Sequence, residues 1–271
     1  MITPIAITEK LLFSTVRLKT ASGCGTGFFF NFKFEEKNAP VIITNKHVVN
    51  NKNIETVNFL LHVADNGKPT NENIEINYAA KWVFHPSLDL CFSFVNPLFE
   101  EIKHKSNKTV FYTPITEELI WDDTKLEELQ AVEDVFMFGS PNGLWDEKNN
   151  LPLIRKGITA SHAVVDFNKE SVGVVDLSVF PGSSGSPLLI INTGGYSDKK
   201  GNHYVGANRV IFIGILYAGP ILNQKGEISI QEIPTQQKAI ATTPLMINLG
   251  YYIKSKEMFV LKKMAENLIN K

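Results

Sequence analysis

Short apolar segments alternate with polar turns along most of this chain. The segments are rich in Val, Ile, Phe and Thr, and patches of Gly, Asn, Asp and Pro, which favour turns, separate them. This pattern predicts many short β-strands and therefore an all-β fold built from barrels or sandwiches. The expected strands lie near residues 26–32, 40–45, 56–64, 90–95, 135–140, 153–165, 171–180, 186–191 and 209–219.

Three stretches break this pattern. Residues 115–134 are acidic and lack strand alternation, which favours a connector between two halves that includes a helical turn. Residues 192–209 are polar and glycine-rich, so we expect an exposed hairpin excursion there. Residues 255–270 carry apolar side chains at helical spacing, which predicts an amphipathic helix packed on the last strands. The apolar positions of this helix are Met258, Leu261, Met264 and Leu268.

The composition narrows the classes of partner. The chain has 271 residues, of which 44% are apolar and 20% charged, and its formal net charge is −1. Arginine occurs only at Arg17, Arg155 and Arg209, so the sequence offers no basic field for nucleic acid and no polybasic stripe for a membrane. We therefore expect neither nucleic acid nor a membrane among the partners.

Location and cofactors follow from the N-terminal segment and the cysteines. The N-terminal segment lacks a signal-peptide pattern, and no later segment approaches the roughly 18 apolar residues of a membrane span, which predicts a cytoplasmic protein. Cys24 and Cys91 are the only cysteines, and their spacing does not suit a zinc site. We expect two free thiols, no metal and no cofactor; a redox clamp between two strands is the alternative.

The most informative segment is FPGSSGSPLLI, residues 180–190, where a Gly-x-Ser-Gly turn lies between two apolar strands. Its small residues allow a tight turn from which the Ser184 hydroxyl projects, while the backbone N–H groups of Gly182 and Ser184 converge. Converging donors stabilise an oxyanion, so Ser184 is a candidate nucleophile. Taken alone, the segment fits a hairpin turn without chemistry equally well.

A serine nucleophile needs a neighbouring base, and His47 is the best-placed histidine for this role. It lies just beyond the apolar strand VIITN, where a strand end can carry the imidazole to a barrel surface. Asp89 begins another apolar strand and is the candidate carboxylate that orients the imidazole, whereas its competitor Asp65 lies in an evident turn. The other histidines have less constrained settings: His62, His85, His104, His162 and His203.

Further motifs occur in order around these three residues. They are Gly25-Thr26-Gly27-Phe28, residues 44–49, Asp89-Leu90, residues 138–141, Gly157-Ile158, residues 181–188 and residues 213–215. With these motifs the chain resembles the chymotrypsin-like serine peptidases, and most closely the trypsin-like peptidases of the bacterial HtrA (Deg) type, here without a PDZ domain.

The resemblance implies two six-stranded antiparallel β-barrels and a C-terminal α-helix in a single peptidase domain over residues 1–271. The expected parts are a first barrel near 10–112, a connector near 113–134, a second barrel near 135–253 and the helix near 255–270. The resemblance also implies the roles of the candidate residues. These are His47 as general base, Asp89 as its orienting carboxylate, Ser184 as nucleophile, and the N–H groups of Gly182 and Ser184 as oxyanion hole.

Some positions depart from the family pattern. Lys46 and Val48 flank His47 without the cysteines that extracellular relatives have around this loop, which supports a reducing location. Ser183 stands where many digestive relatives carry the Asp that binds a newly cut N-terminus, so activation by such cleavage is not expected. Because Gly182 can adopt several backbone conformations, we expect activity to be controlled by ordering of the cleft instead. Ser186 replaces a frequent glycine, a small-for-small change.

The resemblance also places the pocket for the residue before the scissile bond. Ser178 corresponds to its floor, and its wall corresponds to Tyr217, Ala218 and Gly219. None of these residues is acidic, which favours an apolar or small substrate side chain, although Asp176 and residues 192–209 could reach the site.

Two functions from different classes remain. The leading one is a serine endopeptidase that cleaves specific proteins through an acyl-enzyme, with protein or peptide substrates and room for a regulatory protein partner in a bacterial regulatory or defence system. The alternative is a catalytically silent binding module on the same scaffold.

Overall fold

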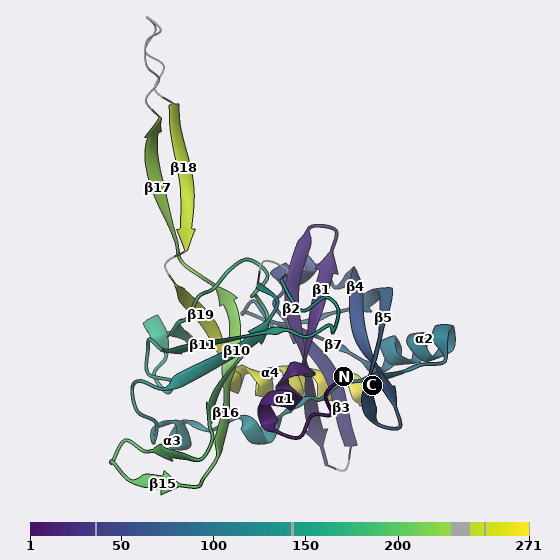
Figure 1. Cartoon of the computed structure of the whole chain (residues 1–271), viewed down its shortest axis with the longest axis horizontal. Helices are drawn as coiled ribbons and strands as arrows, with labels where there is room; N and C mark the ends of the chain where they lie inside the picture. Colours follow the sequence, from purple (N-terminus) through teal and green to yellow (C-terminus); the bar gives the residue numbers. More distant parts are fainter. Residues whose placement is uncertain (36, 142–143, 229–238, 247, 271) are drawn as a thin grey trace, which may run out of the picture.

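The computed structural model of the chain describes residues 1–35, 37–141, 144–228, 239–246 and 248–270. Two β-structured halves lie next to one another, and a two-stranded ribbon projects from the second half (Figure 1). Strands predominate throughout the described part, so the predicted all-β fold class is confirmed.

The first half forms one nine-stranded sheet, in the order β5-β4-β1-β2-β3-β7-β6, with β8 on β4 and β9 on β2. Three of these strands have only two or three residues, which is why the sheet exceeds the six strands expected. The longer strands are β1 (Thr15–Thr20), β2 (Gly23–Phe34), β3 (Lys37–Thr44), β4 (Ile54–Asp65), β5 (Lys68–Lys81) and β7 (Cys91–Phe94). The short ones are β6 (Val83–Phe84), β8 (Thr109–Phe111) and β9 (Ile115–Thr116).

Two helices accompany this sheet, and neither was predicted. The short helix α1 (Ile7–Leu12) precedes β1, and α2 (Asn96–Ser106) follows β7. A proline stands at the start of α2, and Leu98 and Ile102, one helical turn apart, are buried in the core of the first half. Among the described helices, none is long and apolar enough to cross a membrane.

The second half closes into a six-stranded barrel, in the order β10-β11-β12-β19-β16-β13. Its strands are β10 (Asp134–Gly139), β11 (Leu153–Thr159), β12 (Val172–Asp176), β13 (Pro187–Asn192), β16 (Arg209–Ala218) and β19 (Leu249–Lys254). The strand expected over 153–165 stops at Thr159, because the N–H groups of Ala160 and Ser161 both turn to the carbonyl of Val174 and end the regular ladder.

The segments between and around these strands follow the sequence pattern in part. The acidic stretch contains η2 (Glu117–Leu119) and α3 (Asp123–Leu126), which are the expected helical turns. The glycine-rich stretch forms the expected hairpin, from β14 (Gly195–Ser197) and β15 (His203–Val205). A second hairpin, from β17 (Ile221–Ile228) and β18 (Ala239–Met246), was not predicted and forms the projecting ribbon of Figure 1.

Strand β2 joins the cores of the two halves because it is buried on both faces. Phe28, Phe30 and Phe32 point to one face and pack in a cluster that includes residues of the second barrel. Phe28 lies 5.5 Å from Phe212 of β16 between ring centroids. Phe29, on the opposite face, packs inside the first half. Because side chains alternate between the two faces of a strand, β2 contributes apolar side chains to the cores of both halves.

The C-terminal helix α4 (Met258–Ile269) is confirmed, but its packing differs from the expectation. Met258 and Leu261 are buried, whereas Leu268 is 42% exposed and Ala265 fills the buried position instead. The helix packs in the cluster that contains Phe30 and Phe32, so it contacts the first half rather than only the last strands. It thereby joins the two halves a second time.

The burial of His62 predicts a pH dependence of stability. This residue of β4 packs against Phe13, 4.8 Å away between ring centroids, and burial lowers its pKa from 6.5 to about 4. Between these two values the unfolded chain binds a proton that the folded protein excludes, so stability should fall as pH falls through this window. The full difference is about 3 kcal/mol, at roughly 1.4 kcal/mol per pKa unit.

Urea unfolding measured at several pH values from 7 to 4 checks this expectation. His62→Phe should lose about 3 kcal/mol less stability than the wild type over the window. The matched variant His104→Phe, at an exposed position of α2, should keep the wild-type dependence. An unchanged acid-induced loss in His62→Phe would show that another group is responsible.

Candidate active site

His47 stands at the start of a single 3₁₀ turn, η1 (His47–Val49), just after β3. Val48 and Val49 are buried beneath it, and Asn50 closes the turn in the left-handed conformation, with φ of 56°. Gly25 of β2 lies against this turn so closely that an added Cβ would come within 2.5 Å of Val48. The buried valines therefore fix the turn, and the His47 side chain stays partly exposed above them.

Asp89 lies between β6 and β7 and binds His47 twice. Its Oδ2 is 2.5 Å from His47 Nδ1, and its Oδ1 accepts a hydrogen bond from the His47 backbone N–H at 3.2 Å. Asn45 holds the same loop, because its Nδ2 donates to the Asp89 carbonyl oxygen at 2.7 Å. The structure thus brings together two of the predicted site residues, which are 42 positions apart in sequence.

The environment of Asp89 fixes its charge and the tautomer of His47. Burial raises the pKa of the Asp89 carboxyl, but hydrogen bonds and the attraction of His47 outweigh it, so the pKa lies below its usual value. An ionised carboxylate can only accept, so Nδ1 of His47 carries the proton of this hydrogen bond. In the neutral ring, Nε2 is left with a lone pair that can accept a proton.

Ser184 lies in a turn in which two glycines have positive φ. The N–H of Ser183 donates to the Phe180 carbonyl at 3.0 Å, and Gly182 between them has φ of 89°, as in a type II turn. Gly185 has φ of 86°, and a Cβ there would lie 1.9 Å from the Thr26 carbonyl oxygen. Only glycine fits at this point, because both the backbone angle and the space exclude a side chain.

The serine turn is tied to both halves of the molecule. The Thr26 N–H on β2 donates to the Ser184 carbonyl at 2.9 Å, and the Thr26 hydroxyl donates to the Gly182 carbonyl at 3.0 Å. The Gly185 N–H donates to the Leu216 carbonyl of β16 at 2.8 Å. The carbonyl groups of Gly182 and Ser184 are therefore occupied, whereas the N–H groups of the same two residues have no acceptor among the described residues.

His47 and Ser184 line the same cleft, whose volume is about 290 Å³. The cleft is also lined by Thr20, Ser22, Gly23, Cys24, Val48, Pro181 and Gly182. Within the described residues no hydrogen bond joins His47 Nε2 to Ser184 Oγ, so that contact stays a prediction. Such bonds are often long in an empty site and shorten when substrate binds.

The predicted pocket residues lie outside this cleft lining. Ser178 Oγ donates to the Asn248 side chain at 3.3 Å, and the Ser178 carbonyl accepts a hydrogen bond from the guanidinium of Arg155. Gly219 packs closely, because a Cβ at that position would lie 3.2 Å from the Leu249 carbonyl oxygen and 3.5 Å from Val179 Cγ1. Tyr217 and Ala218 end β16 in half-buried positions. The sequence did not point to Arg155, because this residue of β11 contacts Ser178 from 23 positions away in sequence.

A second histidine supports the Asp89 loop and was not singled out from the sequence. His85 is buried, its Nδ1 accepts from the N–H groups of Ser87 and Leu88 at 3.3 and 3.0 Å, and its Nε2 lies 3.1 Å from Glu257. Burial lowers the pKa of His85 and outweighs the opposing effect of Glu257, so the ring is neutral and its Nε2–H donates to Glu257. Glu257 directly precedes α4 and so connects this helix to the Asp89 loop.

The cysteines and the other side chains that could bind a metal are further candidates for chemistry. Cys24 and Cys91 are both free, and burial raises the pKa of the Cys91 thiol well above its usual value. In the described residues, no three His, Cys, Asp or Glu side chains gather in a way that could hold a metal ion.

Comparison with known proteins assigns the family. The family described as a trypsin-like peptidase domain matches residues 25–195, which is more than half of the chain. The chain belongs to this family. The matched part of the trypsin-like domain contains His47, Asp89 and Ser184, whereas Leu216 and Gly219 lie beyond it.

Solved structures similar to this trypsin-like domain are distant in sequence. One is an inactivated protease paralogue, S-I1, of the scabies mite, with 10% identity, a TM-score of 0.45 and coverage of 97% of each chain. Another is the thermostable serine protease AL20 from an extremophilic microorganism, with 14% identity, a TM-score of 0.41 and coverage of 90% of this chain and 92% of that one. No match was found among curated proteins.

The His85–Glu257 contact predicts different effects for two substitutions. Glu257→Ala removes the acceptor of a buried N–H and should lower the free energy of unfolding by about 1–3 kcal/mol. Glu257→Gln keeps an acceptor and should have a much smaller effect. Urea unfolding at pH 7 measures both, with Glu266→Ala at an exposed position of α4 as the control. Equal losses for the Ala and Gln variants would contradict this account.

Proposed function

We propose that this trypsin-like domain is a serine endopeptidase that acts through His47, Asp89 and Ser184. One observation carries the proposal: Asp89 holds Nδ1 of His47 at 2.5 Å while His47 and Ser184 line one cleft. A binding module would have no need of an oriented imidazole that opens on the same space as a turn serine. The order of motifs around these residues also supports our proposal that, within the family, the domain is of the HtrA type.

The reaction begins with proton transfer from Ser184 to His47. Nε2 of His47 takes the hydroxyl proton as Oγ attacks the carbonyl carbon of the scissile bond, and Asp89 stabilises the resulting imidazolium. The carbonyl oxygen becomes an oxyanion, which the N–H groups of Gly182 and Ser184 can bind because no described residue occupies them. His47 then gives its proton to the leaving amine, and an acyl-enzyme on Ser184 remains.

The second stage repeats these steps with water. His47 accepts a proton from a water molecule as its oxygen attacks the acyl carbon, and the same N–H groups bind the second oxyanion. The Ser184 Oγ leaves with the proton from His47, and the carboxylic acid product is released. Every proton that His47 takes is returned, so the enzyme ends in its starting state.

Several features bear on control and location. The type II turn at Gly182 supports control through the cleft, because the central peptide of such a turn can rotate and carries the Gly182 N–H. Free thiols at Cys24 and Cys91, with no cysteine beside His47, fit the reducing cytoplasm better than an extracellular location.

Covalent labelling tests the proposed nucleophile. A fluorophosphonate should label the wild-type chain once, and Ser184→Ala should abolish the label without changing the melting temperature, because it removes one hydroxyl from a turn. Ser22→Ala is the matched control, since Ser22 lines the same cleft and should stay dispensable. Absence of labelling in a folded wild-type chain would favour the silent binding module.

Substrate preference tests the proposed pocket. Arg155 donates to the Ser178 carbonyl, so a positive charge lies at the floor of the proposed pocket and should repel Lys or Arg side chains. Peptides with Ala, Leu or Phe before the scissile bond should exceed those with Lys or Arg by at least about tenfold in kcat/KM, which corresponds to roughly 1.4 kcal/mol. The measurement is hydrolysis of a matched peptide series. Faster cleavage after Lys or Arg would refute this pocket.

A further inference from the structure

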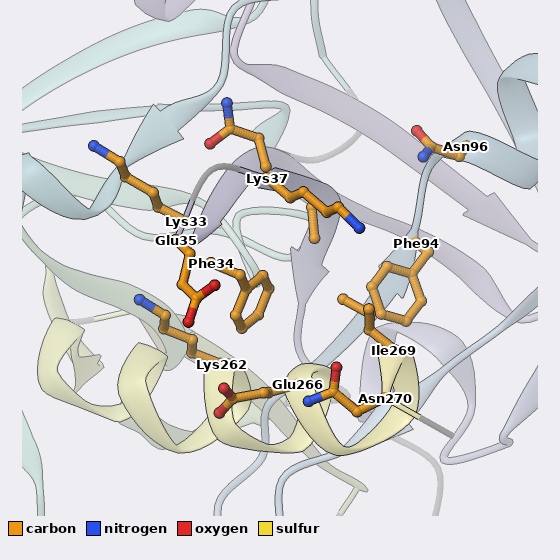
Figure 2. A pocket seen from close by; sticks show the side chains of 12 residues that line it. Lys33, Phe34, Glu35, Lys37, Phe94, Asn96, Lys262, Glu266, Ile269 and Asn270 are labelled. Carbon is orange, nitrogen blue, oxygen red and sulfur yellow. The ribbon is translucent and has the colours of Figure 1, made fainter.

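A hollow of about 860 Å³ opens between the end of β2, the start of β3 and the last turns of α4 (Figure 2). It is far larger than the cleft of about 290 Å³ that His47 and Ser184 line. Phe34 of β2, Phe94 of β7 and Ile269 of α4 supply its apolar lining, and Ile269 is 49% exposed. Figure 2 shows Phe94 and Ile269 close to one another, with the Lys37 side chain extending toward them.

The hollow also exposes a short strand edge. Strand β7 pairs with β3 only from Val41 to Thr44, and the chain then turns away into α2. The Pro40 carbonyl accepts the Val95 N–H at 3.2 Å, so the backbone groups of Pro40 face the β7 side. Alternate residues of a strand face the same way, so the N–H and C=O of Asn38 face it too, and no described residue bonds them there.

The sequence fits an edge at this point. Pro40 has no N–H to donate, and proline is tolerated in a sheet where that donor would face an edge. Exposed edges with free N–H and C=O groups pair readily with an added strand. Here the free part is short and has lysines beside it, which limits pairing to a segment that complements them.

Charged side chains of both signs line the hollow, namely Lys33, Lys37 and Lys262 together with Glu35 and Glu266. A carboxylate of an occupant is favoured at one place, beside Lys37, which adjoins the free edge at Asn38. Lys262, which also lines the hollow, is paired with Glu117 at 2.8 Å. Lys37 lies at the end of β3 and has no carboxylate within 4.0 Å among the described residues. A second copy of the chain fits poorly, because antiparallel pairing about Asn38 would bring two Lys37 side chains together on one face.

We propose that this hollow binds an extended segment of a partner protein as an added strand on β3. The segment bonds the N–H and C=O of Asn38, packs apolar side chains against Phe94 and Ile269, and places a carboxylate near Lys37. In recognition of this kind, main-chain hydrogen bonds provide affinity, and the contacts of alternate side chains of the bound segment provide specificity. It is independent of the Ser184 chemistry.

The position of the hollow leaves the cleft open when a partner is bound. Strand β2 has 12 residues, with Cys24 at the cleft and Phe34 at the hollow. At roughly 3.3 Å per residue its two ends are up to about 36 Å apart. A bound segment would therefore hold its protein beside the domain without blocking Ser184.

The probe that tests the proposal is a fluorescein-labelled heptapeptide, Asp-Glu-Val-Phe-Val-Glu-Asp, followed by fluorescence anisotropy with the full chain. Ser184→Ala should bind it as the wild type does, which separates this site from catalysis and prevents cleavage of the probe. Lys37→Glu should weaken binding at least about tenfold. Lys81→Glu, at an exposed position of β5, is the matched control and should leave binding unchanged.

A second variant tests the strand edge itself. Asn38→Pro removes only an N–H that faces the hollow, so it should keep the melting temperature and weaken binding about tenfold or more. If this variant fails to fold, Lys37→Glu still decides the question. Three outcomes would overturn the proposal: no binding, equal binding of the peptide with Lys for each Asp and Glu, or sedimentation of the wild-type chain as a dimer that Asn38→Pro dissociates.

Discussion

One buried threonine connects the two halves of the molecule at the candidate site. The Thr26 hydroxyl donates to the Gly182 carbonyl and accepts the Ser140 N–H, while its backbone N–H donates to Ser184. Its carbonyl accepts the Thr44 hydroxyl, at the end of the strand that leads to His47. Because Thr26 is fully buried, any of these groups that lost its partner while the halves stayed packed would be an unsatisfied buried polar group, which costs about 1–3 kcal/mol. The position of Ser184 relative to His47 therefore depends on this residue.

Close packing around Thr26 explains why glycines surround it. The site needs backbone approaches too close for a side chain, and Gly185 lies against the Thr26 carbonyl while Gly139 lies against the hydroxyls of Ser186 and Thr26. The hydrogen bonds fix how far apart the strands can be, and the glycines make that separation attainable. The hydrogen bonds of Thr26 and the glycines beside it therefore both set the distance between the strands at the site.

The sequence predicted what depends on local pattern and missed what depends on long-range contact. Alternating apolar residues located most strands, and the end of an apolar strand located His47 beside Asp89. Helix α2 was missed although Leu98, Phe99 and Ile102 have helical spacing, because the Asn96-Pro97 pair before them is equally typical of a turn. Two contacts join segments that are separated in sequence, so no local pattern predicts them. They are the contact of Arg155 with Ser178 and that of His85 with Glu257. These contacts form only when the tertiary structure brings the two segments together.

The β17–β18 ribbon can vary in length without altering the barrel that carries it. It emerges between β16 and β19, which are neighbours in the closed barrel, and its strands pair antiparallel from Ile221 with Met246 to Ile228 with Ala239. Residues added or removed in pairs along it would leave the register of β16 with β19 untouched. The ribbon begins two positions after Gly219, beside the proposed pocket wall. Evolution can therefore change the length and the sequence of the ribbon beside that pocket while the barrel that supports it stays the same.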